Sequence, residues 1–344
     1  MRSVSISRRR ALLAGLAATL AAGLPLATPA LAQDAAPHPL PVVATFSILG
    51  DIVKNVGGDR ISVVTLVGPN GDTHVYQPTP QAAKEVAEAA VVFENGLGLE
   101  GWMDRLVKAS GTKAELVAVT QGVTPRYRTA SEPQDDDEEE GHDAAGQSAA
   151  GHDHAEAAPA EAHKGHDHGP LDPHAWQNVA NVEIYAANIR DALIKADPAG
   201  AEAYKAQAAA YIEKLKVLDA QVRTAMAGIP VKQRRIITSH DAFGYFGDAY
   251  GLKLLAPQGV STEAEASAKD VGRIIRQIKS QKIPAVFLEN IADPRLAQRI
   301  AKESGARVGG ELYSDALSDD KGPASTYIDM IQSNVRELSS ALSS

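Results

Sequence analysis

Short apolar runs alternate with helix-like segments in two separate parts of the chain, and this alternation most limits the fold. In the first part the expected strands are PVVATF, ISVVTLVG, VVFEN and ELVAV, with helices near 48–56, 79–89 and 101–109. In the second part the expected strands are RRIITS, LKLLAP, PAVFLEN and ARVGG, with helices near 242–250, 268–281, 294–304 and 325–342. Such alternation favours parallel sheets covered by helices on both faces. We therefore predict an α/β protein with two Rossmann-like lobes, at 40–198 and 233–344.

A long helical segment connects these two parts. A helix expected at 179–196 ends before Pro198, and a second one is expected from Ala199 to Met226, within a linker at 199–227. Apolar residues line one side of it, at Tyr204, Tyr211, Leu215, Leu218, Val222 and Met226. At 1.5 Å per residue this helix is roughly 40 Å long. That length suits a rigid spine between two lobes better than a helix within one lobe.

The segment 130–169 breaks the pattern because it has no apolar periodicity. Between 132 and 168 it holds twelve acidic residues and one lysine, a net charge of −11, whereas the whole chain has a formal net charge of −9. This composition predicts a disordered surface loop. Its histidines are His142, His152, His154, His163, His166 and His168. They indicate accessory metal binding, with a collecting or sensing role, and the alternative is a solvated insertion without function.

The first 32 residues have the pattern of an export signal. A start rich in arginine precedes the apolar run ALLAGLAATLAAGLPLA, and the small residues before Gln33 predict cleavage near Ala32. SRRRALL also contains a twin arginine, so both export routes stay open. The chain has no cysteine, which excludes disulfides, thiolate metal sites and a lipid-anchored cysteine. We expect an exported protein, free in a periplasm. With no basic stripe and 5% aromatic residues, no nucleic-acid partner is expected.

Histidines outside the loop stand at informative positions. His74 follows the strand ISVVTLV, His240 follows RRIITS, and His174 stands where the loop returns to ordered structure, whereas His38 is read as incidental. Open parallel sheets bind ligands beyond the carboxyl ends of their strands. The three histidines could therefore face one interlobe cleft. Three imidazoles suit Zn²⁺, and Asp315, which follows the strand ARVGG, is the best fourth ligand.

These residues also admit other interpretations. Each histidine alone could be a capping or core residue, and the helical zinc motif H-E-x-x-H is absent. Three histidines and a carboxylate also describe a catalytic zinc centre, but a hydrolase needs an open coordination position and a general base. A metal buffer or a surface adhesin is a third interpretation. The missing anchor argues against an adhesin, and an ordered interlobe site argues against a metal buffer.

Four stretches carry a resemblance to a known family: GPNGDTHVYQPTP, LDPHAWQNVAN, IITSHDAFGYFGDAYGL and LYSDAL. Through them the sequence resembles the metal-binding solute-binding proteins of ABC transporters, the cluster that captures zinc or manganese. The resemblance covers the chain from about Pro41 onward. It implies two α/β lobes, a rigid connecting helix and one metal buried between the lobes. By position, the four metal ligands correspond to His74, His174, His240 and Asp315.

The resemblance also suggests which metal is bound. Manganese binders of this family typically carry Glu at the third ligand position, where this chain has His240, and imidazole suits Zn²⁺ better than Mn²⁺. The expected function is therefore capture of Zn²⁺ and delivery to an ABC transporter membrane permease, by a protein that is not an enzyme. A manganese- or iron-binding member of the family is the alternative. A periplasmic zinc chaperone is a further candidate partner, and a monomer is expected.

Some details of the predicted site stay open. Water, or Asp72 beside the first histidine, could replace Asp315 as the fourth ligand. Ligating histidines usually donate their second ring N–H to a carboxylate or carbonyl, and Asp241 and Glu289, at expected strand ends, could accept it. Trp176 and Tyr245 could wall the site, although packing roles are the simpler reading.

Overall fold

The structure, a computed structural model, describes residues 39–127 and 171–343. The expected signal segment at 1–32 lies outside the described residues. So do the six loop histidines, His142, His152, His154, His163, His166 and His168. None of the described helices is both long enough and apolar enough to cross a membrane.

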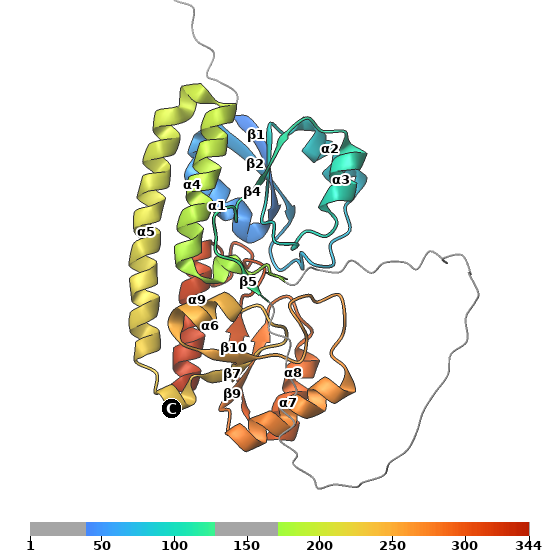
Figure 1. The fold of residues 1–344 in the computed structure, drawn as a ribbon, viewed down its shortest axis with the longest axis vertical. Coiled ribbons are helices and arrows are strands. Elements are labelled where there is room, and N and C mark those ends of the chain that lie inside the picture. The colour runs from blue at the N-terminus through green and yellow to red at the C-terminus, as the bar shows by residue number, and fades with distance from the viewer. Residues whose placement is uncertain (1–38, 128–170, 344) are drawn as a thin grey trace, which may run out of the picture. The chain divides into compact units, whose positions relative to one another are not determined.

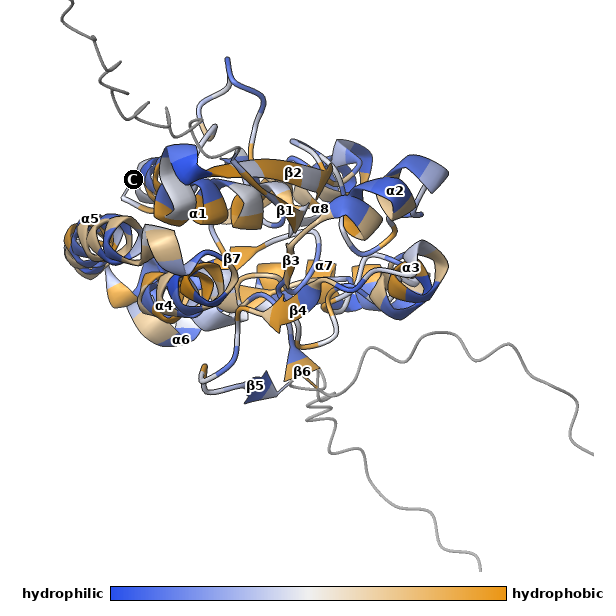
Figure 2. Cartoon of the chain, turned by 90° about the horizontal axis from the view of Figure 1, so that it is seen from above, coloured by the Kyte–Doolittle hydropathy of each residue, from blue (hydrophilic) through white to orange (hydrophobic). Residues whose placement is uncertain are grey.

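The first lobe is built on a parallel sheet in the order β2-β1-β3-β4 (Figure 1). Its strands are β1 (Leu40–Phe46), β2 (Ile61–Val67), β3 (Val91–Glu94) and β4 (Glu115–Ala118). Its helices are α1 (Ser47–Gly57), α2 (Pro80–Glu88), α3 (Met103–Ser110) and α4 (Val179–Ala196). In Figure 2 the strands β1, β3 and β4 are largely hydrophobic, whereas the helices beside them mix both kinds of residue. Burial of β1 and β3 explains why their sequences read as continuous apolar runs.

The second lobe repeats this topology. Its strands are β7 (Arg235–Ile237), β8 (Lys253–Leu255), β9 (Ala285–Glu289) and β10 (Arg307–Leu312). They form a parallel sheet in the order β10-β9-β7-β8, which in chain order is the same arrangement as in the first lobe. Its helices are α6 (Gly244–Tyr250), α7 (Ala268–Gln281) and α8 (Pro294–Ser304). The prediction of two α/β lobes with parallel sheets is confirmed.

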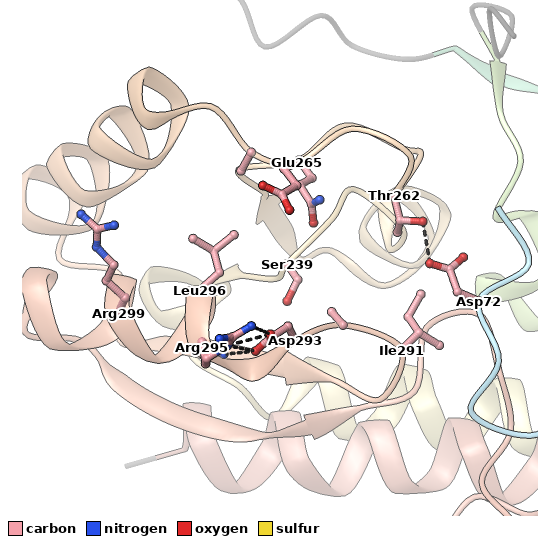
Figure 3. Close-up of a pocket in the computed structure, with 12 residues that line it drawn as sticks. Asp72, Ser239, Thr262, Glu265, Ile291, Asp293, Arg295, Leu296 and Arg299 are labelled. Atoms are coloured by element: carbon pink, nitrogen blue, oxygen red, sulfur yellow. Dashed lines mark hydrogen bonds and ion pairs between the residues drawn. The ribbon is translucent and has the colours of Figure 1, made fainter. Parts of the chain in front are cut away.

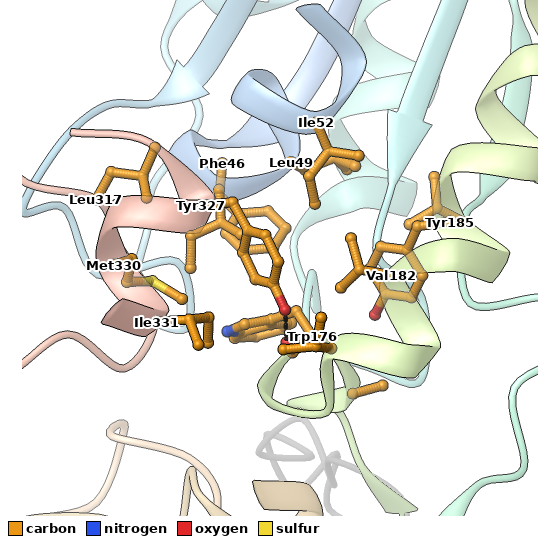
Figure 4. Close-up of a cluster of buried hydrophobic side chains, with 14 of the residues drawn as sticks. Phe46, Leu49, Ile52, Trp176, Val182, Tyr185, Leu317, Tyr327, Met330 and Ile331 are labelled. Atoms are coloured by element: carbon orange, nitrogen blue, oxygen red, sulfur yellow. Dashed lines mark hydrogen bonds between the residues drawn. The ribbon is translucent and has the colours of Figure 1, made fainter. Parts of the chain in front are cut away.

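Two long helices link the lobes. Helix α5 (Ala201–Ala227) packs on α1 and α4 of the first lobe and on α6 of the second, and it buries the apolar stripe expected from the sequence. Helix α9 (Tyr327–Leu342) packs on α5 and β10. At its start, the backbone N–H of Tyr327 donates to Asp51 in α1, and the Tyr327 hydroxyl donates to the Trp176 carbonyl. Figure 4 shows Tyr327 and Met330 of α9 among Phe46, Leu49 and Val182, so one hydrophobic core continues between the lobes.

A short antiparallel ribbon is the element that the sequence did not predict. Strand β5 (Arg126–Tyr127) pairs with β6 (Leu171–Asp172), in the register Arg126↔Asp172 and Tyr127↔Leu171. Two-residue strands carry no periodic signal, and β5 and β6 are separated by the acidic segment. The ribbon places Asp172 two residues before His174.

Candidate metal centre

The four residues proposed as ligands come together from both lobes. Their donor atoms lie within 4.8 Å of one another, and all four side chains are buried. His74 lies on the loop after β2, His174 follows β6, His240 follows β7, and Asp315 follows β10. Sequence positions beyond the carboxyl ends of parallel strands thus converge, as expected for open α/β sheets.

The spacing of the donor atoms fits a tetrahedral ion. His74 Nε2 lies 3.3 Å from His174 Nε2 and 3.1 Å from Asp315 Oδ2. His240 Nε2 lies 3.1 Å from the same oxygen, and His174 Nε2 lies 3.6 Å from Asp315 Oδ1. Donors 2.0–2.1 Å from a central Zn²⁺ are about 3.3 Å apart at the corners of a tetrahedron. The four distances are close to this spacing, all the donor atoms lie within 4.8 Å of one another, and the donor types suit a four-coordinate zinc site.

Two carboxylates lie behind the cluster: Asp172 is hydrogen-bonded to the ring of His174, and Glu289 lies in close contact with the ring of His240. His174 Nδ1 lies 2.8 Å from Asp172 Oδ1, and His240 Nδ1 lies 2.6 Å from Glu289 Oε2. A ring that donates its Nδ1–H to a carboxylate presents the Nε2 lone pair to a metal, and its basicity increases. Glu289 Oε1 also accepts the backbone N–H groups of Ser239 and His240, which fixes the turn after β7.

The residue before each of three ligands is also held by a buried side chain. Trp102 Nε1 donates to the Thr73 carbonyl at 2.9 Å, and Asn95 Nδ2 donates to the Pro173 carbonyl at 2.9 Å. The Ser314 carbonyl accepts from Trp176 Nε1 and Gln177 Nε2 of the first lobe, at 2.9 and 2.7 Å. The backbone at His74, His174 and Asp315 is therefore constrained before any metal binds.

Burial and neighbouring charges shift the pKa of each of the four residues in the cluster. Burial lowers the pKa of His174, but Asp315 and Asp172 outweigh burial and raise that pKa to about 9. Burial likewise opposes the charge of His240, yet Glu289 and Asp315 hold its pKa well above the usual value. For His74, burial dominates and lowers the pKa. Burial would raise the pKa of Asp315, but His240 and His174 hold it well below the usual range.

A pocket of about 500 Å³ adjoins the cluster (Figure 3). It is lined by Asp72 and Ser239, which lie two and one residues before His74 and His240, and by residues of α8 such as Arg295. At its edge the Thr262 hydroxyl of the second lobe donates to Asp72 Oδ2 of the first lobe at 2.6 Å. Asp72 thus faces the pocket and the other lobe, and the donor group of four does not include it.

The sequence suggested Glu289 and Asp241 as carboxylates that contact the histidine rings, and the structure places only Glu289 in such a contact. Glu289 does contact a ligand histidine, but the backbone N–H of Asp241 bonds to the Gly259 carbonyl, and Asp172 takes the role proposed for Asp241. The signal for Asp172 was available, because DTH and DPH place an aspartate two residues before His74 and before His174. The Trp176 ring packs 5.3 Å from the His174 ring, whereas the Tyr245 hydroxyl bonds to the Arg126 backbone.

Comparison with known proteins identifies the family. The family model described as "Zinc-uptake complex component A periplasmic" matches residues 42–341. The iron-binding protein YfeA of Yersinia pestis is 35% identical over 294 residues, which cover 86% of this chain and 83% of that protein. The manganese-binding lipoprotein MntA of Halalkalibacterium halodurans is 34% identical over 304 residues, 88% of this chain and 89% of that protein.

Solved structures agree with this relationship. The periplasmic zinc-binding protein TroA of Treponema pallidum superposes with a TM-score of 0.74 at 28% identity, over 88% of this chain and 99% of TroA. A manganese-bound periplasmic metal-binding protein from Candidatus Liberibacter asiaticus gives a TM-score of 0.71 at 28% identity, over 89% of this chain and all of that one. The chain therefore belongs to the zinc-uptake component A family, the metal-binding solute-binding proteins of ABC transporters, which work outside the cytoplasm and are not enzymes.

Proposed function

We propose that this protein captures Zn²⁺ in the periplasm and delivers it to an ABC transporter permease for import. The observation that carries the proposal is the donor set of His74, His174, His240 and Asp315, whose donor atoms all lie within 4.8 Å of one another. Three imidazole nitrogens and one carboxylate are a typical zinc set, whereas Mn²⁺ favours oxygen ligands and octahedral geometry. In this proposal the protein acts as a monomer, and a periplasmic zinc chaperone is a further candidate partner.

A manganese or iron carrier is the second candidate function. The metals named for YfeA and MntA favour it, and so does the second carboxylate oxygen of Asp315, which lies 3.6 Å from His174 Nε2. A bidentate Asp315 would add an oxygen donor and a fifth coordination position. A zinc-dependent hydrolase is less well supported, because four protein donors fill a tetrahedron and leave no position for a reactive water.

Competition titration against a chelator of known affinity tests the metal assignment. We expect Zn²⁺ to bind far more tightly than Mn²⁺ or Fe²⁺, and equal or tighter Mn²⁺ binding would exclude the zinc assignment. The double variant His240→Glu, Glu289→Gln sharpens the test. It replaces an imidazole by a carboxylate and removes the like charge that would face it, so the preference for Zn²⁺ over Mn²⁺ should shrink. The single variant Glu289→Gln is the matched control.

Localisation and the acidic segment belong to the same proposal. Several relatives are named lipoproteins, among them PsaA of Streptococcus pneumoniae, and these names conflict with the expectation of an unanchored protein. The expectation of an unanchored protein rests on the lack of cysteine and stays a prediction. The loop histidines are proposed to gather zinc ions weakly, because a stretch without apolar periodicity offers no scaffold to fix ligand geometry.

A further inference from the structure

We infer that Arg126 is a positioning residue for the metal centre, acting on His174 through Asp172 and tying that ligand to helix α6 of the other lobe. The inference rests on the proposed metal site and deepens it. Arg126 lies in β5, directly opposite Asp172 in the ribbon. It is outside the donor group, so any effect on metal binding must pass through its neighbours.

The path from Arg126 to the ligand consists of two consecutive contacts. Arg126 Nη1 donates to Asp172 Oδ2 at 3.0 Å, and Asp172 Oδ1 accepts both the ring Nδ1–H of His174 at 2.8 Å and its backbone N–H at 3.0 Å. The Asp172 side chain is fully buried, so its charge needs a compensating partner. Arg126 supplies that charge on one oxygen and leaves the other oxygen to orient the imidazole.

The same arginine is held by the second lobe. Arg126 Nε donates to Asp248 Oδ2 at 3.0 Å, and its backbone N–H donates to the Tyr245 hydroxyl at 2.8 Å. Both partners belong to α6, which starts at Gly244. One guanidinium therefore joins a buried carboxylate of the first lobe to an acidic side chain of the second. A planar group with several fixed donors can make both contacts at once, whereas an ammonium cannot.

Gly244 gives independent evidence that this ion pair is closely packed. A Cβ added at Gly244 would overlap the guanidinium of Arg126 and lie 2.7 Å from Asp172 Oδ2. The φ of Gly244 is not in the left-handed region, so backbone conformation does not require glycine there. Gly244 therefore leaves space for the Arg126–Asp172 pair, because it has no side chain. Any side chain at position 244 should displace the pair and, through it, the ring of His174.

The test compares full-length variants that disturb the pair in two different ways. Arg126→Gln removes the charge, and Gly244→Ala keeps every charge but fills the space. Arg60→Gln is the matched control, because Arg60 also forms an ion pair, with Asp197 at 2.7 Å, on residues outside the donor group. Arg126→Lys keeps the charge but loses the second contact. The probes are Zn²⁺ and Co²⁺ alone, with affinity measured by competition, dissociation followed by stopped flow, and geometry read from the visible spectrum of Co²⁺.

We expect Arg126→Gln and Gly244→Ala to weaken metal affinity about tenfold, to speed dissociation and to change the Co²⁺ spectrum, as loss of an outer-shell partner does. Arg126→Lys should recover part of the affinity, and Arg60→Gln should match the wild type. Wild-type affinity and spectrum in both Arg126→Gln and Gly244→Ala would overturn the inference. Equal losses in Arg126→Gln and Arg60→Gln would overturn it too, because they would indicate general destabilisation. Failure of the wild type to bind either ion would overturn the proposed function as well.

Discussion

Two turns of the same local design deliver two of the ligands, and they differ in what their aspartates do. Asp72-Thr73-His74 and Asp172-Pro173-His174 both use an aspartate Oδ1 to accept the backbone N–H of the histidine, at 2.9 and 3.0 Å. In both, a buried side chain donates to the carbonyl of the middle residue. The local sequence therefore sets the backbone of each turn in the same way.

The two aspartates then diverge. Buried Asp172 accepts the ring Nδ1–H of His174 and pairs with Arg126. Asp72, which lines the open pocket, accepts the hydroxyl of Thr262 from the other lobe instead. One aspartate orients a ligand ring, and the other joins the lobes beside the pocket. The difference shows that the Asp-x-His pattern defines the backbone turn. The residue that contacts the second carboxylate oxygen of the aspartate defines what that aspartate does.

The largest expected effect comes from removing a ligand that one of these turns presents. His174→Ala should cost about 4 kcal/mol of zinc binding, roughly a thousandfold in affinity, since a structural zinc site shares its binding energy among four ligands. His74→Ala and His240→Ala should behave alike. Asp315→Ala should cost less, because water can replace a carboxylate oxygen. Competition titration measures these losses, and unchanged tight binding in one histidine variant would remove that residue from the ligand set.

A smaller effect distinguishes the two aspartates directly. Asp172→Asn should weaken zinc binding about 10- to 100-fold, because an amide nitrogen must then face either the His174 N–H or the Arg126 guanidinium. Asp72→Asn should change affinity by less than about threefold, since its amide can still accept the His74 N–H and donate to Thr262. The two variants are isosteric, so each is the control for the other. Equal losses in both would show that the two turns have the same role.

The third expected effect is on the pH dependence of binding. The pKa of His174 is raised to about 9, so below that pH the metal-free protein carries a proton there that zinc must displace. Apparent affinity should therefore rise as pH increases from 7 towards 9, by up to about tenfold per pH unit for each proton displaced. Asp172→Asn should lower the pKa of His174 and flatten this rise, and Asp72→Asn should not. Calorimetry in buffers of different ionisation enthalpy counts the protons, and no proton release would contradict the assignment.

Much of the fold was predictable because its signals are local. The sequence predicted α4 at 179–196, α7 at 268–281 and α8 at 294–304 with the bounds that the structure shows. Caps explain this accuracy: Asn178, Ser267 and Asp293 accept the first backbone N–H groups, and α8 begins at a proline. The buried stripe of α5 was equally readable, because its spacing repeats with the helical period.

Only part of the candidate metal site could be predicted from the sequence. The positions of His74, His240 and Asp315 after predicted strands indicated convergence in one interlobe cleft, since open parallel sheets bind ligands beyond the carboxyl ends of their strands. The pairing of Asp172 with Arg126, and of Asp72 with Thr262, had no such signal. These partners lie 46 and 190 residues apart in the sequence, and no periodicity connects them.

The sequence alone thus determined the types of donor atom, the turns that present His74 and His174, and the helices and strands that carry them. These features depend on interactions between residues that are only a few positions apart in the sequence. Only the tertiary structure decided that Asp172 pairs with Arg126 and Asp72 with Thr262, that α9 connects the lobes as α5 does, and that Gly244 makes room for the Arg126–Asp172 pair. Those outcomes depend on how segments far apart in the sequence pack against each other, and such side-chain contacts are not encoded in any local pattern.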